Sequence, residues 1–345
     1  MSDAPLARRP RPVAGSLQRT PEETVRPVLS RRALPALGLA AALPAPALAQ
    51  WNPSRPVTIV VPFPPGGSTD VTARLMAEKM APLLGQNVVI DNKPGAQTVI
   101  GAEAVARAAP DGHTMLMSSG TTLTINPLIG RNLPYRPADF APVLHVATLP
   151  FCIAVRPGIP NTLEGFVAHV RANPGKVTWG HNGRGSFNHI AGALIAERLN
   201  LDWQDVGYRG DAHQMNDLLA GTLDSILVGG ATGLQVARSG RAKIIGWTGE
   251  SRLPNLPDQP VFHEIWPGLV AITWFGLLAP ARTPPAAVAR LNAAAAAAAA
   301  DPTLRERLLD QGILAAGGTP ADFQAFLARE AERWAPLLRR LDITL

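Results

Sequence analysis

The chain alternates short β-branched apolar runs with longer segments in which apolar residues recur every three or four positions. The run Val57–Val61 has the composition of a strand that is buried on both faces. After a break at 64–67, apolar residues return at helical spacing as far as Leu84, with Leu75, Met76, Met80 and Leu83 on one side. The same pattern predicts strands at 87–91 and 113–117 and a helix at 99–108. Because strands alternate with helices, we expect a parallel sheet with right-handed crossovers.

The stretch 140–155 is long, apolar and mostly extended, and we interpret it as a crossover into a second domain. Strands and helices alternate again beyond it. The expected strands are 177–180, 225–228, 243–248 and 272–279, and the expected helices are 161–172, one after Ser186, 214–220, 285–300, and one from 320 that Pro336 should kink or shorten. We interpret 272–279 as a return strand. The predicted domains are therefore 50–151 with 275–345, and 152–274.

Residues 1–49 have the pattern of an export signal. A polar, proline-rich stretch, expected to be disordered, leads to Ser30-Arg31-Arg32 and an apolar run that ends in Ala47-Leu48-Ala49. The small residues at its end predict cleavage near Ala49, which places the mature protein in the periplasm. The twin arginines fit a twin-arginine signal. An ordinary Sec signal with two incidental arginines fits as well, so both routes stay open.

Charge and cysteine content narrow the function. The net charge is +6, but residues 1–49 hold seven Arg and three acidic residues and so account for +4. The remainder has no basic stripe interleaved with aromatics, so we expect no nucleic-acid partner. The single cysteine, Cys152, excludes an intramolecular disulfide and a cysteine-based metal site. Its apolar surroundings favour a small buried hydrophobe over a catalytic thiol.

Two glycine-rich loops carry the candidate chemistry. The first, 64–70, leads from a strand into a helix that Ser68 or Thr69 can cap, and 182–186 repeats this order in the second predicted domain. Such loops aim backbone N–H groups and a helix dipole at one spot, which suits an anion. The polar loop 118–122 also follows a strand, and it should converge with the first loop on one edge of the sheet. The sequence thus predicts an anion-binding cleft.

Catalytic and cofactor motifs are missing from the sequence. There is no G-x-S-x-G elbow, Walker loop or H-E-x-x-H, and Gly183-Arg184-Gly185 lacks the third glycine of a dinucleotide fingerprint. His181 and His189 flank the second loop, but the lack of a third ligand argues against a metal pair. Asp70 suits a general base or a loop brace, and we favour the brace. For Tyr208 and Arg209, ligand contact and ordinary surface roles stay open. We expect no cofactor and no metal.

Ordered motifs occur along 51–334. They are Arg55-Pro56-Val57, Val61–Asp70, Asp91–Ala96, Gly101-Ala102-Glu103, Ala109–Thr114, Asp139–Val143, Gly183–Ser186 with His189, and Trp274–Pro280. Together they resemble the Bug-type extracytoplasmic receptors of tripartite tricarboxylate transporters. The chain departs from the family at Tyr208-Arg209-Gly210, where Tyr-Lys-Gly is common, and at Gly229-Gly230, where an acidic or polar residue is common. His181 and Arg184 are also bulkier than usual, so the second-domain side of the pocket is expected to differ.

The resemblance implies a periplasmic-binding-protein-like fold, in which two α/β domains close on a small carboxylate held by backbone N–H groups, hydroxyls and bridging waters. The residues expected to bind the ligand are Pro65, Gly66, Gly67, Ser68, Thr69, Asp70, Ser119, Gly120, Asn182, Gly183, Gly185, Ser186, Tyr208 and Gly230. Arg184 and Arg209 would suit a second carboxylate.

The main hypothesis is a monomeric periplasmic receptor that captures a mono-, di- or tricarboxylate for the membrane subunits of a tripartite tricarboxylate-type transporter. The first alternative is an orphan receptor used for sensing. The second is an exported hydrolase-like enzyme that uses Asp70 with His189 or His181. We expect no enzymatic activity, because the sequence holds no catalytic constellation.

Overall fold

The computed structural model describes residues 51–130 and 132–341, which lie in one compact unit, Leu48–Leu345. The predicted export signal and its cleavage site lie outside the described residues. Within the described ranges, no helix combines the length and the apolar content needed to cross a membrane.

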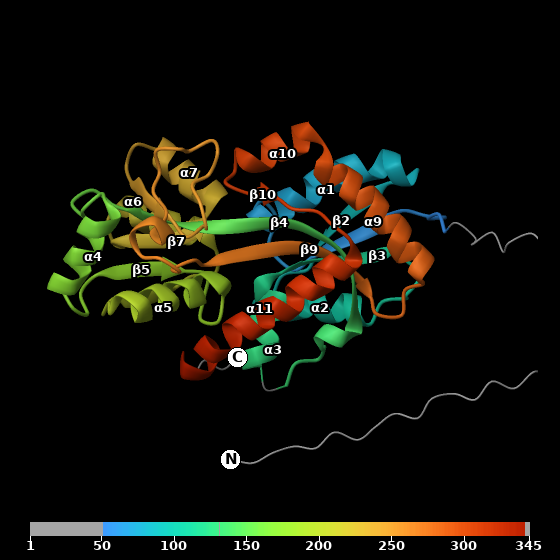
Figure 1. The fold of residues 1–345 in the computed structure, drawn as a ribbon, viewed down its shortest axis with the longest axis horizontal. Coiled ribbons are helices and arrows are strands. Elements are labelled where there is room, and N and C mark those ends of the chain that lie inside the picture. Colours follow the sequence, from blue (N-terminus) through green and yellow to red (C-terminus); the bar gives the residue numbers. More distant parts are fainter. Residues whose placement is uncertain (1–50, 131, 342–345) are drawn as a thin grey trace, which may run out of the picture. The chain divides into compact units, whose positions relative to one another are not determined.

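The strands of this described part form one mixed ten-stranded sheet, in the order β2-β1-β3-β9-β4-β7-β5-β6, with β8 and β10 also paired to β4 (Figure 1). Their bounds are β1 Val57–Val61, β2 Val88–Asn92, β3 Thr114–Ser119, β4 Phe140–Val155, β5 Thr178–His181, β6 Gln204–Gly207, β7 Ser225–Gly229, β8 Lys243–Trp247, β9 Ile272–Pro280 and β10 Leu314–Ala315.

The expectation of a parallel sheet is only partly right. β1 pairs in parallel with β2 and β3, and β5 pairs in parallel with β6 and β7. However, β9 is antiparallel to β3 and β4, and β4 is antiparallel to β7 and β8. The return strand β9 therefore runs against the strands of the first half of the sheet, so the sheet is mixed.

Strand β4 joins the two halves of the sheet. Its residues 140–150 pair with β9, and its residues 151–155 pair with β7 and β8.

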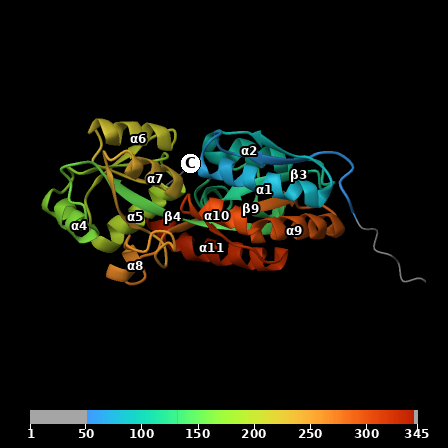
Figure 2. The same ribbon diagram turned by 90° about the horizontal axis from the view of Figure 1, so that it is seen from above.

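Figure 2 shows α1, α2 and α9 grouped around one half and α4, α6 and α7 around the other. The helices are α1 Ser68–Leu84, α2 Val99–Ala106, α3 Asn126–Ile129, α4 Leu163–Ala172, α5 Phe187–Leu199, α6 Asp211–Ala220, α7 Gly230–Arg238, α8 Phe262–Ile265, α9 Pro285–Ala300, α10 Pro302–Leu309 and α11 Pro320–Leu341. The domain boundaries themselves stay a prediction.

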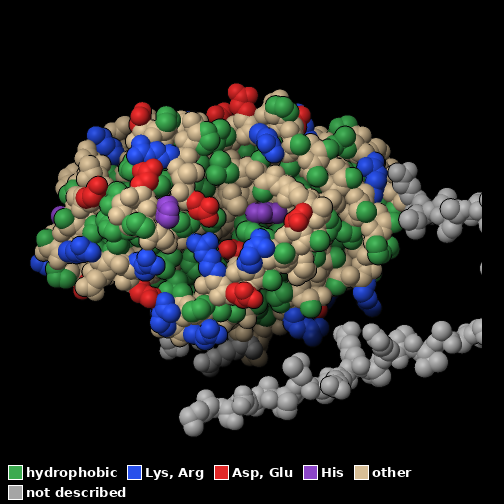
Figure 3. All heavy atoms as spheres, in the orientation of Figure 1, with side chains coloured by type: hydrophobic (Ala, Val, Ile, Leu, Met, Phe, Trp, Pro, Cys, Tyr) green, Lys and Arg blue, Asp and Glu red, His purple; other side chains and the backbone are tan. Residues whose placement is uncertain are grey.

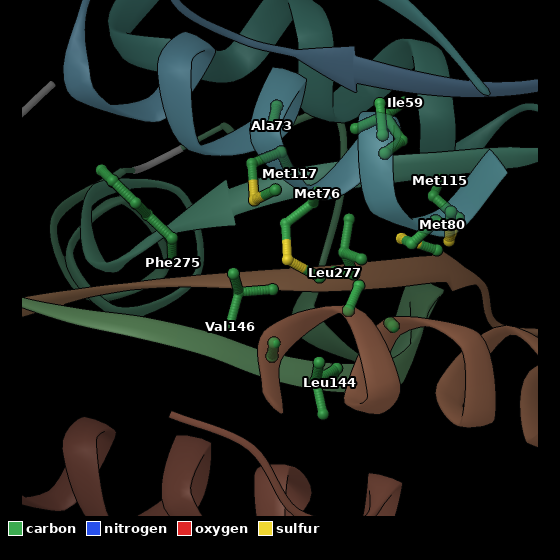
Figure 4. Packing of buried hydrophobic residues seen from close by; sticks show 14 of the residues in the cluster. Ile59, Ala73, Met76, Met80, Met115, Met117, Leu144, Val146, Phe275 and Leu277 are labelled. Carbon is green, nitrogen blue, oxygen red and sulfur yellow. The ribbon is translucent and has the colours of Figure 1, made fainter. Parts of the chain in front are cut away.

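The buried apolar residues of the described part form several clusters, of which two are the largest. In the first, methionines of α1 and β3 pack against Leu277 of β9 and Val146 of β4 (Figure 4). In the second, Trp179, Phe166 and Phe187 are buried together. Cys152 is fully buried, as expected, and burial raises the pKa of its thiol.

Several local expectations are wrong. The N-cap of α1 is the extended Gly67, with no side-chain cap from Ser68 or Thr69, because α1 begins at Ser68. The supposed loop 118–122 is the end of β3 followed by a wide helical turn, η2 (Thr121–Ile125). Helices α7 and α10 were not expected, and α11 is not shortened by Pro336 but continues to Leu341.

Candidate functional site

The first loop connects β1 to α1 and is mostly exposed. Gly66 has φ +87°, a left-handed conformation that L side chains rarely adopt. Gly67 is extended, with φ −78° and ψ 168°, and caps α1 without a side-chain hydrogen bond. Because the first N–H groups of a helix have no intrahelical acceptor, those at the start of α1 are available to an anion.

Asp70 braces this loop, as the sequence favoured. Its Oδ2 accepts hydrogen bonds from Gly66 N and Arg74 Nε, both at 2.9 Å, and its Oδ1 accepts one from Asn92 Nδ2 at 2.9 Å. Burial opposes ionisation, but the bonds from Arg74, Gly66 and Asn92 outweigh it and lower the pKa of the carboxyl. Asp70 is only 2% exposed and is committed to the loop.

The second loop connects β5 to α5 and is internally bonded. Gly183 and Gly185 both have positive φ, 94° and 83°. Ser186 caps α5: its Oγ accepts from His189 N at 3.4 Å and lies 2.6 Å from Gly183 O. Asn188 adds a bond from Asn182 N to its Oδ1 at 3.2 Å. Unlike α1, α5 therefore uses its N-terminal donors and cap within the protein.

A polar network stands behind the second loop. Asn182 Nδ2 donates to Asp211 Oδ1 at 2.7 Å, and Gln214 Nε2 donates to Asn182 Oδ1 at 2.5 Å. Thr232 Oγ1 donates to Asp211 Oδ2 at 2.8 Å. Desolvation raises the pKa of the Asp211 carboxyl, and the bonds from Asn182 and Thr232 oppose it. The sequence reasoning missed Asp211, because an acid in the first turn of a helix usually marks no more than helix-dipole stabilisation.

Segments next to the first loop contact the second loop and the start of α5. Gln97 Nε2 donates to Arg184 O at 3.1 Å, and Phe187 N donates to Thr121 Oγ1 at 3.3 Å. A Cβ placed on Gly229 would lie 3.3 Å from Ser68 Oγ. The structure thus brings the first loop, the second loop and the start of α7 to one region.

Gln97 was not expected to belong to the site. Ala96, Gln97 and Thr98 have consecutive positive φ values of 46°, 52° and 78°, which non-glycine residues rarely adopt. Asn126 Nδ2 holds the Gln97 carbonyl at 2.7 Å. Strained backbone of this kind is found at ligand clamps and active sites. The only signal for it in the sequence is its position just after Pro94-Gly95.

Other expected ligand residues lie in the same region but have roles in packing or bracing. Ser119 is buried, and its Oγ lies 3.2 Å from Thr122 Oγ1. Gly120 lies beneath the Phe187 ring, which a Cβ would meet at 2.6 Å. Gly230 packs against the backbone of 311–312. Tyr208 directs its hydroxyl to Asp217 Oδ2 at 2.7 Å.

His181 and His189 have a third candidate metal ligand beside them, which the sequence did not predict. Asp205 of β6 lies 3.1 Å from His181 Nε2 and 3.9 Å from His189 Nε2, measured to its Oδ2. Two surface hollows, lined by 155–159 with 240–243 and by 106–110 with 280–282, lie away from these residues and from both loops.

Charged side chains around the loops are few. Arg184 and Arg209 are exposed, and Arg74 is the cation nearest to Asp70. On the face drawn in Figure 3, Lys and Arg are scattered among Asp and Glu. Positive charge near the site therefore comes from single arginines and helix N-termini.

The chain is similar to proteins of one known family. Residues 72–343 match the family described as the tripartite tricarboxylate transporter family receptor, TctC. A UPF0065 protein of Pseudomonas sp. (strain P51), from the tcbD-tcbE intergenic region, is 39% identical over 290 residues, which are 83% of this chain and 86% of the relative. Protein BugT of Bordetella pertussis is 33% identical over 303 residues, which are 87% and 93% of the two chains.

Solved structures also match this chain over most of its length. The periplasmic binding protein BugD is 34% identical, with a TM-score of 0.77 over 85% of this chain and 99% of BugD. An R. palustris protein solved with adipate is 30% identical, with a TM-score of 0.80 over 85% and 99% of the chains. MatC from Rhodopseudomonas palustris, with bound malate, is 32% identical, with a TM-score of 0.75 over 83% and 99%. The expected periplasmic-binding-protein-like fold is confirmed.

Proposed function

The chain belongs to the tripartite tricarboxylate transporter receptor family, and from this premise we propose that it captures a small carboxylate in the periplasm for a tripartite tricarboxylate-type transporter. Membership confirms the resemblance to Bug-type receptors and the expectation of a binding protein rather than an enzyme. The ligand class, the transporter partnership, the monomeric state and the export signal belong to the proposal.

The observation that carries the proposal is the contrast between the two helix N-termini. Helix α1 begins at an exposed loop with no side-chain cap, whereas α5 is capped by Ser186. An uncapped helix start with a glycine loop offers its N–H groups and its dipole to an anion. We therefore assign the carboxylate to the first loop, at Pro65–Thr69, with Asp70 acting through the loop that it braces.

The second loop supplies the opposite wall. Its own hydrogen bonds leave Gly183, Gly185 and Ser186 as shape-forming residues. The Asn182 amide is held by Asp211 and Gln214, and Arg184 is the exposed side chain of this loop. An exposed Arg184 suits a second carboxylate on a di- or tricarboxylate ligand. Adipate and malate, present in two of the solved relatives, are both dicarboxylates, which supports this choice.

The test is a thermal-shift panel of mono-, di- and tricarboxylates with purified protein. A ligand that binds the folded state raises the melting temperature by mass action, by an amount that grows with its concentration. We expect at least one dicarboxylate to raise it more than the matching monocarboxylate. No shift from any carboxylate at about 1 mM would refute the proposed ligand class.

The genes next to that of the receptor distinguish a transport role from a sensing role. A receptor that serves a transporter should have genes for the two membrane subunits beside its own, and deletion of those genes should abolish uptake of the ligand found in the panel. Uptake that persists without them would favour the orphan receptor.

A further inference from the structure

Three side chains that commonly bind transition metals meet beside the second loop. His181 ends β5, His189 lies in the first turn of α5, and Asp205 lies on the edge strand β6. One ligand atom of each lies within 4.8 Å of those of the other two. The residues are separate in the sequence, so the fold brings this donor set together.

Both imidazoles face the same carboxylate oxygen. Asp205 Oδ2 lies 3.1 Å from His181 Nε2 and 3.9 Å from His189 Nε2, and the two rings are 4.5 Å apart at an angle of 48°. Ligand atoms about 2.0–2.2 Å from a tetrahedral metal are separated from one another by roughly 3.3–3.6 Å. The two distances to Asp205 bracket this spacing, and the ligand atoms of the two histidines lie within 4.8 Å of each other.

The surroundings fix the rings and leave an entry path. Trp179 lies 5.0 Å from the His181 ring and stacks on the His189 ring at 6.2 Å and 7°. Both histidines are nearly fully buried, whereas the side chain of Asp205 is 57% exposed. A metal can therefore reach the cluster from the solvent beside Asp205, where its remaining coordination positions would lie.

Charge around the cluster is mixed. Burial lowers the pKa of His181 and of His189. The carboxylate of Asp205 supplies negative charge. Arg184 is the opposing cation, and it acts on His189 from an exposed position.

We propose that His181, His189 and Asp205 form a binding site for a divalent transition metal. Two imidazoles and one carboxylate suit Zn²⁺, Ni²⁺ or Cu²⁺ better than Mg²⁺ or Ca²⁺, which prefer all-oxygen ligands. With three protein ligands, at least one coordination position stays open for water or another small ligand.

Metal binding would act on the second loop through His189. In the structure, Gly185 N donates to His189 Nδ1 at 3.3 Å, which places the ring proton on Nε2. Coordination at Nε2 moves that proton to Nδ1, so the Gly185 bond is lost. The second loop would then rearrange, and carboxylate affinity would change with it. This link between metal binding and carboxylate affinity rests on the proposed function, whereas the metal site does not.

The direct test is calorimetric titration of metal-stripped protein with ZnCl₂ at neutral pH in a buffer free of carboxylates. We expect one Zn²⁺ per chain. Asp205→Asn and His189→Gln should each weaken binding about tenfold or more. Asp205 is exposed, so its variant should fold normally, which circular dichroism and the melting temperature would check.

Matched controls are Asp202→Asn, an exposed carboxylate just before β6, and His213→Gln, an exposed histidine on α6. Both should bind Zn²⁺ as the unmodified protein does. The proposal is overturned if Zn²⁺ does not bind at about 1 mM, or if the cluster variants and the controls bind it equally. A failed carboxylate panel in the presence of a chelator would count against the proposed function alone.

Discussion

At the scale of single residues, Asp70 shows how a motif that looks catalytic serves as a brace. Both of its oxygens are occupied, and Asn92 is fixed in orientation because it also donates to Phe63 O at 3.1 Å. In Asp70→Asn, the new amide would face either the Gly66 N–H or the Asn92 amide, donor against donor. We expect a loss of about 2–3 kcal/mol in the free energy of unfolding, measured by urea denaturation.

The matched control is Asp91→Asn, whose carboxylate pairs with Lys93 Nζ at 3.0 Å in an exposed position and should cost at most about 1 kcal/mol. The lowered pKa of Asp70 adds a pH signature. Its stabilisation is complete above the unfolded-state pKa and is lost as pH falls through the folded-state pKa. The variant should lack that acid loss, and equal pH profiles would contradict the brace.

Gly67 offers the cleanest residue-scale test of the carboxylate site. Its backbone is extended, and a Cβ there would meet only Pro64 O, at 3.9 Å, so Gly67→Val fits the fold. A branched side chain over the start of α1 should lower carboxylate affinity about tenfold or more while stability changes by less than about 1 kcal/mol. Calorimetry with the ligand from the thermal-shift panel measures the carboxylate affinity, and urea denaturation measures the stability.

The control for Gly67→Val is Ala81→Val, which places the same side chain at the far end of α1. Ser186→Val would be a poor substitute, because removal of the α5 cap alone costs about 1–2 kcal/mol. Undiminished affinity in Gly67→Val would move the carboxylate away from the first loop.

Residue-scale prediction from the sequence succeeded where a residue acts locally. Asp70 follows its loop by a few positions, so its bracing role could be predicted from the sequence. The place of Asp205 beside His181 could not be predicted, because it arises from the pairing of β5 with β6, in which Trp179 lies opposite Asp205. The contact of Gln97 was not predicted for the same reason, because its partner, Arg184, lies in a loop that is distant in the sequence.

At the scale of elements, β4 and α11 meet around a half-buried histidine. His145 stacks on Phe323 at 5.6 Å and on Phe326 at 4.2 Å. Burial lowers its pKa to about 4 from an ordinary value of about 6.5. The fold therefore holds the neutral ring, and stability should be complete above pH 6.5 and fall as pH drops from about 6.5 to about 4.

His145→Phe keeps the aromatic stack and removes the titrating group, so we expect a smaller loss of stability between pH 7 and pH 5. The difference should approach about 1–2 kcal/mol, because each unit of pH in this window is worth up to about 1.4 kcal/mol. Urea midpoints at the two pH values measure it. The control is His213→Gln, at an exposed histidine of α6. A pH profile in His145→Phe that equals that of the unmodified protein would contradict the burial argument.

The extent of the elements was more predictable than their direction. The stretch 140–155 and the helix 285–300 have the bounds expected from apolar pattern and alanine content. The antiparallel placement of β9 was not expected, because strand direction depends on a connection through the whole second half of the sheet. Helix α7 was missed because it starts at Gly230, and glycine gives no helix signal.

At the scale of the whole molecule, a binding protein of this kind needs two halves that can part and close around a ligand. Strands β4 and β9 continue between the halves. Near the loops, the connection also includes polar contacts, such as Gln97 to Arg184, and apolar packing, such as Phe187 on Trp334. The polar contacts are the ones that a ligand bound beside the loops would bias most directly. The domain boundaries predicted from the sequence, near 151 and 275, lie on these two strands.

Gln97 is the side chain through which this closure can be tested. Its amide donates to Arg184 O at 3.1 Å, and its carbonyl is held by Asn126 at 2.7 Å on its own half. Gln97→Ala removes the bond to the carbonyl of Arg184 in the second loop and leaves the bond from Asn126 to its own carbonyl. A net hydrogen bond is worth about 1 kcal/mol, so carboxylate affinity should fall about fivefold, mainly through faster dissociation. Stopped-flow measurement of ligand release reports this, with Gln235→Ala on the exposed face of α7 as the control. If the bond formed equally with and without ligand, the variant would lose stability and keep its dissociation rate, which would exclude Gln97 as a closure contact.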